Sequence, residues 1–310
     1  MGKPIGATLL EDAFDGKQKP IACFKAPSLY LGKALLRTAD WVTAWDLNLF
    51  RQVLGRPVMG ILGMDCLIHY CIQLDFDAGK LRFLDPDHPG DEAWGKVFPL
   101  TLLEDGRCAV SENLMDVEGF RTLIDTGFVG TGSLQSNLFA QAINDAKTHS
   151  GFARYASFGG AREGREGRFA RCIFGGQTYR NLILGEAQTT FLGLDFLARH
   201  RVTLNFPKLE MYLKRRTTNL PDDESGMSGL SITRNGEDAV VNWVGRDSAA
   251  ERAGVKAGDV VLKLNGRPAK ELELWEIRNM LAAGDGKEVR LTVQRGSKTK
   301  RFTIVLKRKL

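Results

Sequence analysis

Two stretches of the chain share one pattern of apolar and polar positions. Residues 62–76 read LGMDCLIHYCIQLDF and residues 192–206 read LGLDFLARHRVTLNF, at a constant offset of 130 residues. In each, an apolar run with a glycine precedes a few residues that fit a short helix, and the pattern then alternates as a strand does. A second alternating segment follows each stretch, at 80–84 and at 209–213. The sequence therefore predicts two copies of one mostly β module.

The repeated pattern ends after Tyr212 in a polar segment, 214–228, that is rich in charged residues and contains Pro221 and Gly226. Such a composition is typical of a linker between domains. A third unit follows, with alternating segments, sharp glycine turns and one further helical stretch. We expect a mainly β protein divided into an incomplete first lobe (1–96), a second lobe (97–213), a linker (214–228) and a third domain (229–310).

Composition agrees with folded domains. Of 310 residues, 43% are hydrophobic and 26% are charged, which is ordinary for globular protein and argues against disorder. The most apolar run, Val58 to Ile72, is broken by Asp65 and His69, so no membrane span is expected. Residues 1–10 lack the charged start and long apolar centre of a signal peptide.

The net charge of +6 arises from 43 basic and 37 acidic residues, and part of the excess lies near the C-terminus. We interpret these basic residues as a solvated strand and tail, because no aromatic residues interleave with them to stack on bases. A nucleic-acid partner is not expected. The residues are Lys298, Lys300, Arg301, Lys307, Arg308 and Lys309.

The five cysteines are Cys23, Cys66, Cys71, Cys108 and Cys172. Their odd number and the lack of a CxxC pair indicate neither a disulfide framework nor a zinc site. Cys66 and Cys71 lie close to His69, which is compatible with a metal, but a free cysteine is most often a small buried hydrophobe. We expect no metal and no organic cofactor.

One acid stands between an apolar strand and a glycine-rich turn. The segment Arg121 to Gly132 reads RTLIDTGFVGTG and contains Asp125, Thr126 and Gly127. An aspartic peptidase requires a carboxylate held at a tight turn and a hydroxyl that locks the loop. It also requires a glycine that lets the backbone and the substrate approach each other closely. The alternative is a structural turn, since Asp-Thr-Gly also forms a good β-turn.

With the strand before it and an apolar-apolar-Gly segment about 65 residues later, this motif resembles the active-site loop of retropepsin-like aspartic peptidases. The resemblance implies two retropepsin-like β-barrel lobes, an incomplete first one over residues 1–96 and a second one over residues 97–213, and it implies that Asp125 is catalytic. It also implies that Phe158 to Arg168 forms a flap hairpin over substrate, for which an exposed mobile loop is the alternative. Asp65 and Asp195 would cap short helices and would not be catalytic.

Such enzymes use two aspartates, and the offset of 130 places the first-lobe equivalent of Asp125 upstream of Met1. Residues 1–96 contain no Asp-Thr-Gly or Asp-Ser-Gly. Three explanations stay open: a truncated start, which we favour as a hypothesis, a degenerate first lobe, or a homodimer that pairs two second lobes.

The third unit carries the strongest signal. Its segment Ser248 to Gly266 reads SAAERAGVKAGDVVLKLNG. It resembles the PDZ domains of bacterial envelope proteases, which add an extended C-terminal peptide to a sheet edge. The resemblance implies that Gly229, Leu230, Ser231 and Ile232 hold the peptide carboxylate, although Ser231 stands where glycine is common. A PDZ domain that only packs on its neighbour is the alternative.

From the sequence we predict an aspartic-type endopeptidase in which Asp125, with Thr126 and Gly127 in its loop, activates water. Its partners would be a polypeptide substrate and C-terminal tails bound by the PDZ domain. The rival prediction is an inactive peptidase-like scaffold that acts as a peptide-binding adaptor. The family resemblance also suggests the bacterial periplasm or cell envelope.

Overall fold

The computed structural model describes residues 2–11, 16–87, 93–115, 117, 119–146, 150–218, 223 and 226–308. Strands dominate, so the predicted mainly β class is confirmed. Among the helices of these residues, none has the length and apolarity that a bilayer crossing requires.

The chain folds into two compact units that each use several stretches of sequence. Unit 1 contains Met1–Trp45, Ile61–Thr148 and Arg168–Asp223. Unit 2 contains Asp46–Gly60, His149–Gly167 and Glu224–Leu310. The domain boundaries expected from the sequence run along the chain, whereas these units interleave, and the expected boundaries stay a prediction.

The first part of unit 1 forms a small antiparallel sheet and a hairpin. The sheet has the order β1-β2-β5, and the hairpin pairs β3 with β4. Their bounds are β1 Gly6–Glu11, β2 Gln18–Lys25, β3 Tyr30–Leu31, β4 Ala34–Leu35 and β5 Trp41–Thr43.

The repeated segments lie side by side in one five-stranded sheet of unit 1, in the order β7-β6-β17-β18-β8. Each copy supplies a four-residue helix and two strands at matching positions. Gln73 of β6 is opposite Thr203 of β17, and its side-chain amide donates to the Thr203 hydroxyl over 3.1 Å. These two residues are themselves 130 apart and so occupy equivalent positions in the two copies. The two copies are therefore related by an approximate two-fold axis that passes near this pair. The elements are α2 Met64–Leu67, β6 Cys71–Asp75, β7 Lys80–Leu84, β8 Lys96–Pro99, α4 Leu194–Leu197, β17 His200–Asn205, η1 Phe206–Lys208 and β18 Glu210–Arg215.

An eight-stranded sheet has the order β13-β14-β15-β12-β16-β11-β10-β9. The short strand β16 lies between β11 and β12, parallel to the first and antiparallel to the second. Buried side chains such as Phe139, Phe174 and Phe196 fill the core beside it. The elements are β9 Thr101–Leu102, β10 Cys108–Val110, β11 Thr122–Ile124, β12 Gly132–Gln135, α3 Ser136–Ala146, β13 Ser150–Ser157, β14 Gly160–Phe174, β15 Gln177–Ala187 and β16 Phe191–Leu192.

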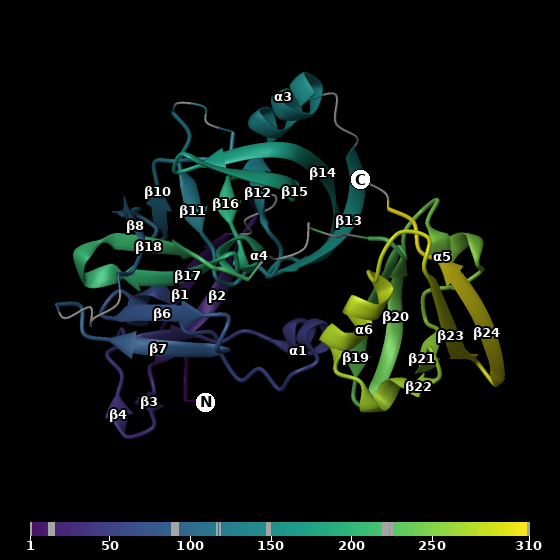
Figure 1. Ribbon diagram of the computed structural model, residues 1–310. Helices are drawn as coiled ribbons and strands as arrows, with labels where there is room; N and C mark the ends of the chain where they lie inside the picture. Colours follow the sequence, from purple (N-terminus) through teal and green to yellow (C-terminus); the bar gives the residue numbers. More distant parts are fainter. Residues whose placement is uncertain are drawn as a thin grey trace. The chain divides into compact units, whose positions relative to one another are not determined.

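Unit 2 is built on a sheet in the order β19-β20-β21-β23-β24, with β22 paired to β21 (Figure 1). Helix α6 packs on this sheet through Leu274, Ile277 and Leu281, which are buried at helical spacing. Helix α1 of the same unit packs against β19. The elements are α1 Asn48–Leu54, β19 Leu230–Asn235, β20 Asp238–Val244, α5 Ala249–Arg252, β21 Val260–Leu264, β22 Arg267–Pro268, η2 Ala269–Glu271, α6 Leu274–Leu281, β23 Glu288–Arg295 and β24 Lys298–Val305.

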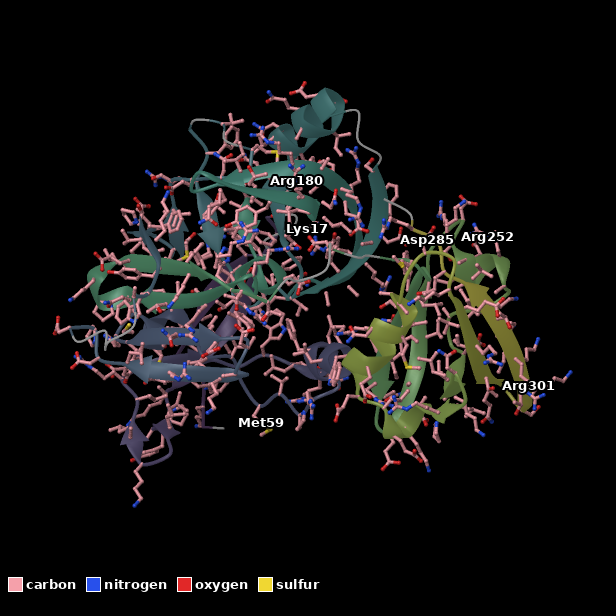
Figure 2. The ribbon with its side chains drawn as sticks, viewed as in Figure 1. Lys17, Met59, Arg180, Arg252, Asp285 and Arg301 are labelled. Atoms are coloured by element: carbon pink, nitrogen blue, oxygen red, sulfur yellow. The ribbon has the colours of Figure 1, made fainter. Side chains whose placement is uncertain are left out.

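The basic residues near the C-terminus lie on the outer strand of this sheet and just beyond it. Lys298, Lys300 and Arg301 are exposed, and Figure 2 shows Arg301 on β24 pointing away from the sheet. Their exposure agrees with the expected solvated strand. Lys309 lies outside the described residues.

Candidate functional site

The loop that carries Asp125 begins where β11 ends and continues to β12. The backbone of β16 fixes its start, because the Asp125 N–H donates to the Leu192 carbonyl over 2.9 Å. Its far end is fixed by the Gly193 N–H, which donates to the Thr131 carbonyl over 2.9 Å. A strand threaded between the two ends of a loop in this way holds the loop in one conformation.

The Asp125 carboxylate is half-buried and accepts a hydrogen bond from the Gly127 N–H over 2.9 Å. Burial raises the pKa of this carboxyl, and the backbone N–H groups of Gly127 and Phe128 oppose part of that rise. Thr126 is half-buried, whereas Gly127 is exposed. The loop therefore presents an acid that stays protonated to a higher pH than an ordinary aspartate.

A second acid lies next to this loop, at the start of α4. The N-cap of α4 is Gly193, and Asp195 lies in the first turn with no side-chain capping bond to that residue. Its backbone N–H donates to the Gly130 carbonyl over 3.2 Å. Burial among protein atoms, and then the charge of Asp223, raise the pKa of Asp195 to about 6. The acid lies in the first turn of the short helix, as expected, whereas capping of the backbone N–H groups by its carboxylate stays a prediction.

Asp223 was assigned to the linker by sequence, but its carboxylate is bound within unit 1. It accepts the Thr131 hydroxyl over 2.5 Å, the Ile183 N–H over 2.9 Å and the guanidinium of Arg199. Only 11% of its side chain is exposed. In the sequence, Asp223 is one of several charged residues in a polar segment. Its partners are distant in the chain, so no local pattern could have identified them.

The segment predicted to be a flap is part of a β-hairpin. Strands β13 and β14 pair antiparallel, with Ser157 opposite Gly160 at the turn. The predicted range of 158–168 therefore covers the turn and part of β14, while β13 lies before it. Closure of this hairpin over a substrate stays a prediction. Glu163 of this hairpin accepts the Trp243 indole N–H over 2.6 Å within unit 2.

Several serine hydroxyls are engaged by the backbone. Those of Ser133 and Ser136 donate to the carbonyls of Thr189 and Ala187, and that of Ser248 accepts the Glu251 N–H. These bonds give the three serines structural roles. Within the described part of the chain, no group of three or more His, Cys, Asp or Glu side chains is arranged to hold a metal ion.

Of the four residues predicted to hold a peptide carboxylate, Gly229 precedes β19, whereas Leu230, Ser231 and Ile232 lie in that strand and pair with β20. Their role in carboxylate binding stays a prediction. Gly229 has φ +72°, and a Cβ at this position would lie 2.1 Å from Ser248 Cβ, so glycine is required there. The Gly245 N–H donates to the Gly229 carbonyl over 2.8 Å. A bulge follows between Ser231 and Ile232.

The backbone at Ser231 is ordinary. Among the described residues, the non-glycine positions with positive φ are Asn181, Leu209, Asp247 and Asn265. Serine at 231 therefore introduces no backbone strain into the loop. Its neighbour Ile232 is buried in the core of the sheet, and Leu230 packs at the edge of that core. The Leu230 N–H donates to the Ser228 hydroxyl over 3.2 Å.

Comparison with known proteins identifies the C-terminal part of unit 2. Residues 240–295 match the family described as PDZ domain. A probable CtpA-like serine protease of Staphylococcus aureus is 33% identical over 100 residues, which are 31% of this chain and 20% of that protein. The corresponding protein of Staphylococcus haemolyticus is 29% identical over 104 residues, or 33% and 21% of the two chains. Among solved structures, a photosystem II D1 C-terminal processing protease is 27% identical, covers 27% of this chain and 23% of its own, and gives a TM-score of 0.26.

These matches correct one prediction. The relatives are named serine proteases, so the aspartic-type endopeptidase predicted from the sequence is wrong, and a retropepsin-like family is not supported. The presence of a PDZ domain and the similarity to proteases that the sequence indicated are both supported. The chain spans about a fifth of the length of the curated relatives it matches.

Proposed function

We propose that the chain is a peptide-recognition protein of a proteolytic system, which binds the C-terminal tails of polypeptides through its PDZ domain. The observation that carries the proposal is the PDZ match over residues 240–295, joined to an edge strand, β19, that follows the Gly229 turn. An extended peptide gains backbone hydrogen bonds at such an edge, and loop N–H groups favour a terminal carboxylate.

The first test measures binding of fluorescein-labelled decapeptides, ending in Ala, Val, Leu or Phe, to the full chain. Each peptide is compared as the free acid and as the C-terminal amide. We expect at least one free acid to bind about tenfold more tightly than its amide, because about 1.4 kcal/mol of carboxylate recognition gives that ratio. Equal binding of acids and amides would contradict carboxylate recognition.

A substitution in the loop provides a second test. Val at position 229 would place its Cβ against Ser248 in a backbone conformation that favours glycine. Gly229→Val should therefore abolish the preference for the free acid. Gly296→Val is the matched control, because Gly296 has φ +59° and no heavy atom within 4 Å of an added Cβ.

For unit 1 we propose that Asp125, Thr126 and Gly127 form a loop that contacts polypeptide. The threaded strand β16 and the raised pKa of the Asp125 carboxyl support this role. No aspartic-type mechanism is assigned to it. Photo-cross-linking of an unfolded polypeptide to this loop should weaken several-fold in Asp125→Asn, and an unchanged yield would remove the loop from the site.

The rival function, an adaptor without peptidase activity, predicts a different outcome in one assay. Hydrolysis of an unfolded protein by the full chain is measured with and without a serine-directed fluorophosphonate. Hydrolysis that the reagent blocks would place serine-type chemistry in this chain. Tail binding without any hydrolysis would identify the chain as an adaptor.

A further inference from the structure

The edge strand of the PDZ domain is covered by a segment from the distant N-terminal region of the chain. In the sheet formed by the described residues, β19 pairs with β20 and stands at the edge. Helix α1 packs against β19, and Figure 1 shows it next to both β19 and α6. All three elements belong to unit 2. An added peptide strand would have to run along the face that α1 occupies.

Contacts at the end of α1 are close. Gly55, its C-cap, has φ +65°, and a Cβ built there would lie 3.1 Å from Leu274 Cβ and 3.3 Å from Arg234 Cγ. Leu274 is the first residue of α6, and Arg234 lies on β19. The backbone of α1 therefore ends between β19 and α6, and we call the space between these two elements the PDZ groove.

An arginine of the groove binds the end of α1. The guanidinium of Arg278, on α6, donates to the carbonyl of Val53, one of the last carbonyls of the helix. A cation at this end also complements the helix dipole. Burial lowers the pKa of Arg278, which agrees with a side chain enclosed beneath α1. Arg56 adds an ion pair with Glu273 over 3.1 Å, but both side chains are largely exposed.

The sequence of the segment favours this helical form. The N-cap of α1 is Leu47, and the carboxylate of Asp46 just before it accepts the Asn48 N–H over 2.9 Å. Gly55 ends the helix in the left-handed conformation. Arg51 Nε donates to the Val58 carbonyl over 2.8 Å, which folds the chain back after the helix. A helix of seven residues is marginal by itself, so its order depends on the surface that it covers.

We propose that residues 46–60 are an intramolecular ligand of the PDZ groove, which must leave before a C-terminal tail can add to β19. This inference rests on the proposed function of the PDZ domain. Because a charge-assisted hydrogen bond changes an equilibrium by roughly tenfold to a hundredfold, a tail of moderate affinity can displace the segment. A cleft of about 770 Å³ beside the helix, lined by Gln52, Arg56, Asn235 and Lys270 among others, leaves an opening at which a tail can enter.

The test compares the binding of the labelled free-acid decapeptides to three full-length proteins: the natural chain, Gly55→Val and Gly296→Val. The substitution at 55 adds atoms against Leu274 and Arg234, whereas position 296 has nearly the same φ but open space. The control therefore matches the backbone strain without touching the groove. Circular dichroism verifies that all three proteins are folded.

Gly55→Val should bind the decapeptides with a Kd about tenfold lower than the other two proteins, as expected when an occupied groove becomes free. A synthetic peptide of residues 46–60 should then compete with the decapeptide on this variant. Equal Kd values for the three proteins, or no competition by the synthetic peptide, would overturn the intramolecular ligand and leave tail binding intact. Failure of all three proteins to bind any free acid would overturn tail binding itself, and this inference with it.

Discussion

At the scale of single residues, buried ionisable groups in unit 1 link its stability to pH. His200 is 1% exposed, and its Nε2 lies 2.9 Å from the Tyr179 hydroxyl oxygen. Burial lowers the pKa of His200 from 6.5 to about 4, and the charges of Arg215 and Arg199 act in the same direction. The folded protein therefore holds this imidazole neutral where an unfolded chain would protonate it.

This difference predicts a loss of stability in mild acid. Between pH 6.5 and 4 the unfolded state binds the proton that the folded state excludes, so the free energy of unfolding should fall by about 3 kcal/mol as the pH decreases. His200→Gln should reduce that slope in denaturant titrations. His69→Gln, at an exposed histidine, is the control and should retain it. A natural chain whose stability is flat over this range would contradict the assignment.

Asp223 gives a second prediction at this scale. Asp223→Ala leaves the Ile183 N–H, the Thr131 hydroxyl and the mostly buried Arg199 guanidinium without their shared acceptor. Loss of such a partner should lower the free energy of unfolding of unit 1 by about 2–4 kcal/mol.

The matched control for Asp223 is Asp87→Ala. Asp87 is 71% exposed and pairs with Lys208 over 3.1 Å, so its loss should cost less than about 1 kcal/mol. Equal costs for the two substitutions in urea titrations would show that Asp223 does not anchor the end of unit 1.

At the scale of elements, one buried ion pair ties the start of β21 to the end of β23. Asp259 is fully buried, and its two oxygens accept Nε and Nη2 of Arg295 over 2.6 and 2.7 Å. The Lys256 N–H is a third donor, at 2.9 Å. Burial opposes ionisation of Asp259, but these hydrogen bonds outweigh it and lower the pKa.

Asp259→Asn should therefore destabilise the PDZ domain by about 3–5 kcal/mol, because it leaves a guanidinium without its buried partner. The stability that this pair provides should be present at neutral pH and lost as the pH falls through the lowered pKa. The control is Arg267→Ala, which removes an ion pair between a largely exposed arginine side chain and Glu276. It should lower the free energy of unfolding by less than about 1 kcal/mol. A similar melting temperature for the two variants would contradict the prediction.

Some of these elements could be predicted from the sequence and others could not. The 130-residue repeat and the alternating segments of the PDZ domain are local patterns, and the structure pairs the repeats through Gln73 and Thr203. The further helical stretch expected in the third domain is α6, at Leu274–Leu281. The contact of Val53 with Arg278 joins residues 225 apart, and no periodicity within α1 reports which surface it covers.

The site itself could be predicted only in part. The position of Asp125 at a turn follows from the residue types around it, whereas the role of Gly229 was implied only by the resemblance to PDZ domains. The type of reaction could not be predicted from the sequence, because a short acidic motif is compatible with several reactions. The similarity to serine proteases extends over only a third of the chain. The anchored Asp223 was missed because its three partners come from residues 131, 183 and 199.

At the level of the whole molecule, the proposed peptide-binding edge β19 and the segment that covers it lie far apart in the sequence. Residues 46–60 belong to the same compact unit as the PDZ domain, although they lie nearly 170 residues before it in the chain. Binding of a tail and binding of this segment to the groove should therefore exclude each other. The segment should lower the affinity for the tail by the same factor by which the tail lowers the affinity for the segment.

Hydrogen exchange of the full chain, with and without a saturating free-acid decapeptide, measures both halves of this equilibrium. With the peptide bound, backbone amides should exchange more slowly in β19, where the peptide adds as a strand, and faster in α1, which leaves the groove. The C-terminal amide at the same concentration should change both less, because it binds about tenfold more weakly. Unchanged exchange in β19 with the free acid would contradict tail recognition at this edge, and slower exchange in both β19 and α1 would contradict the displacement of the segment.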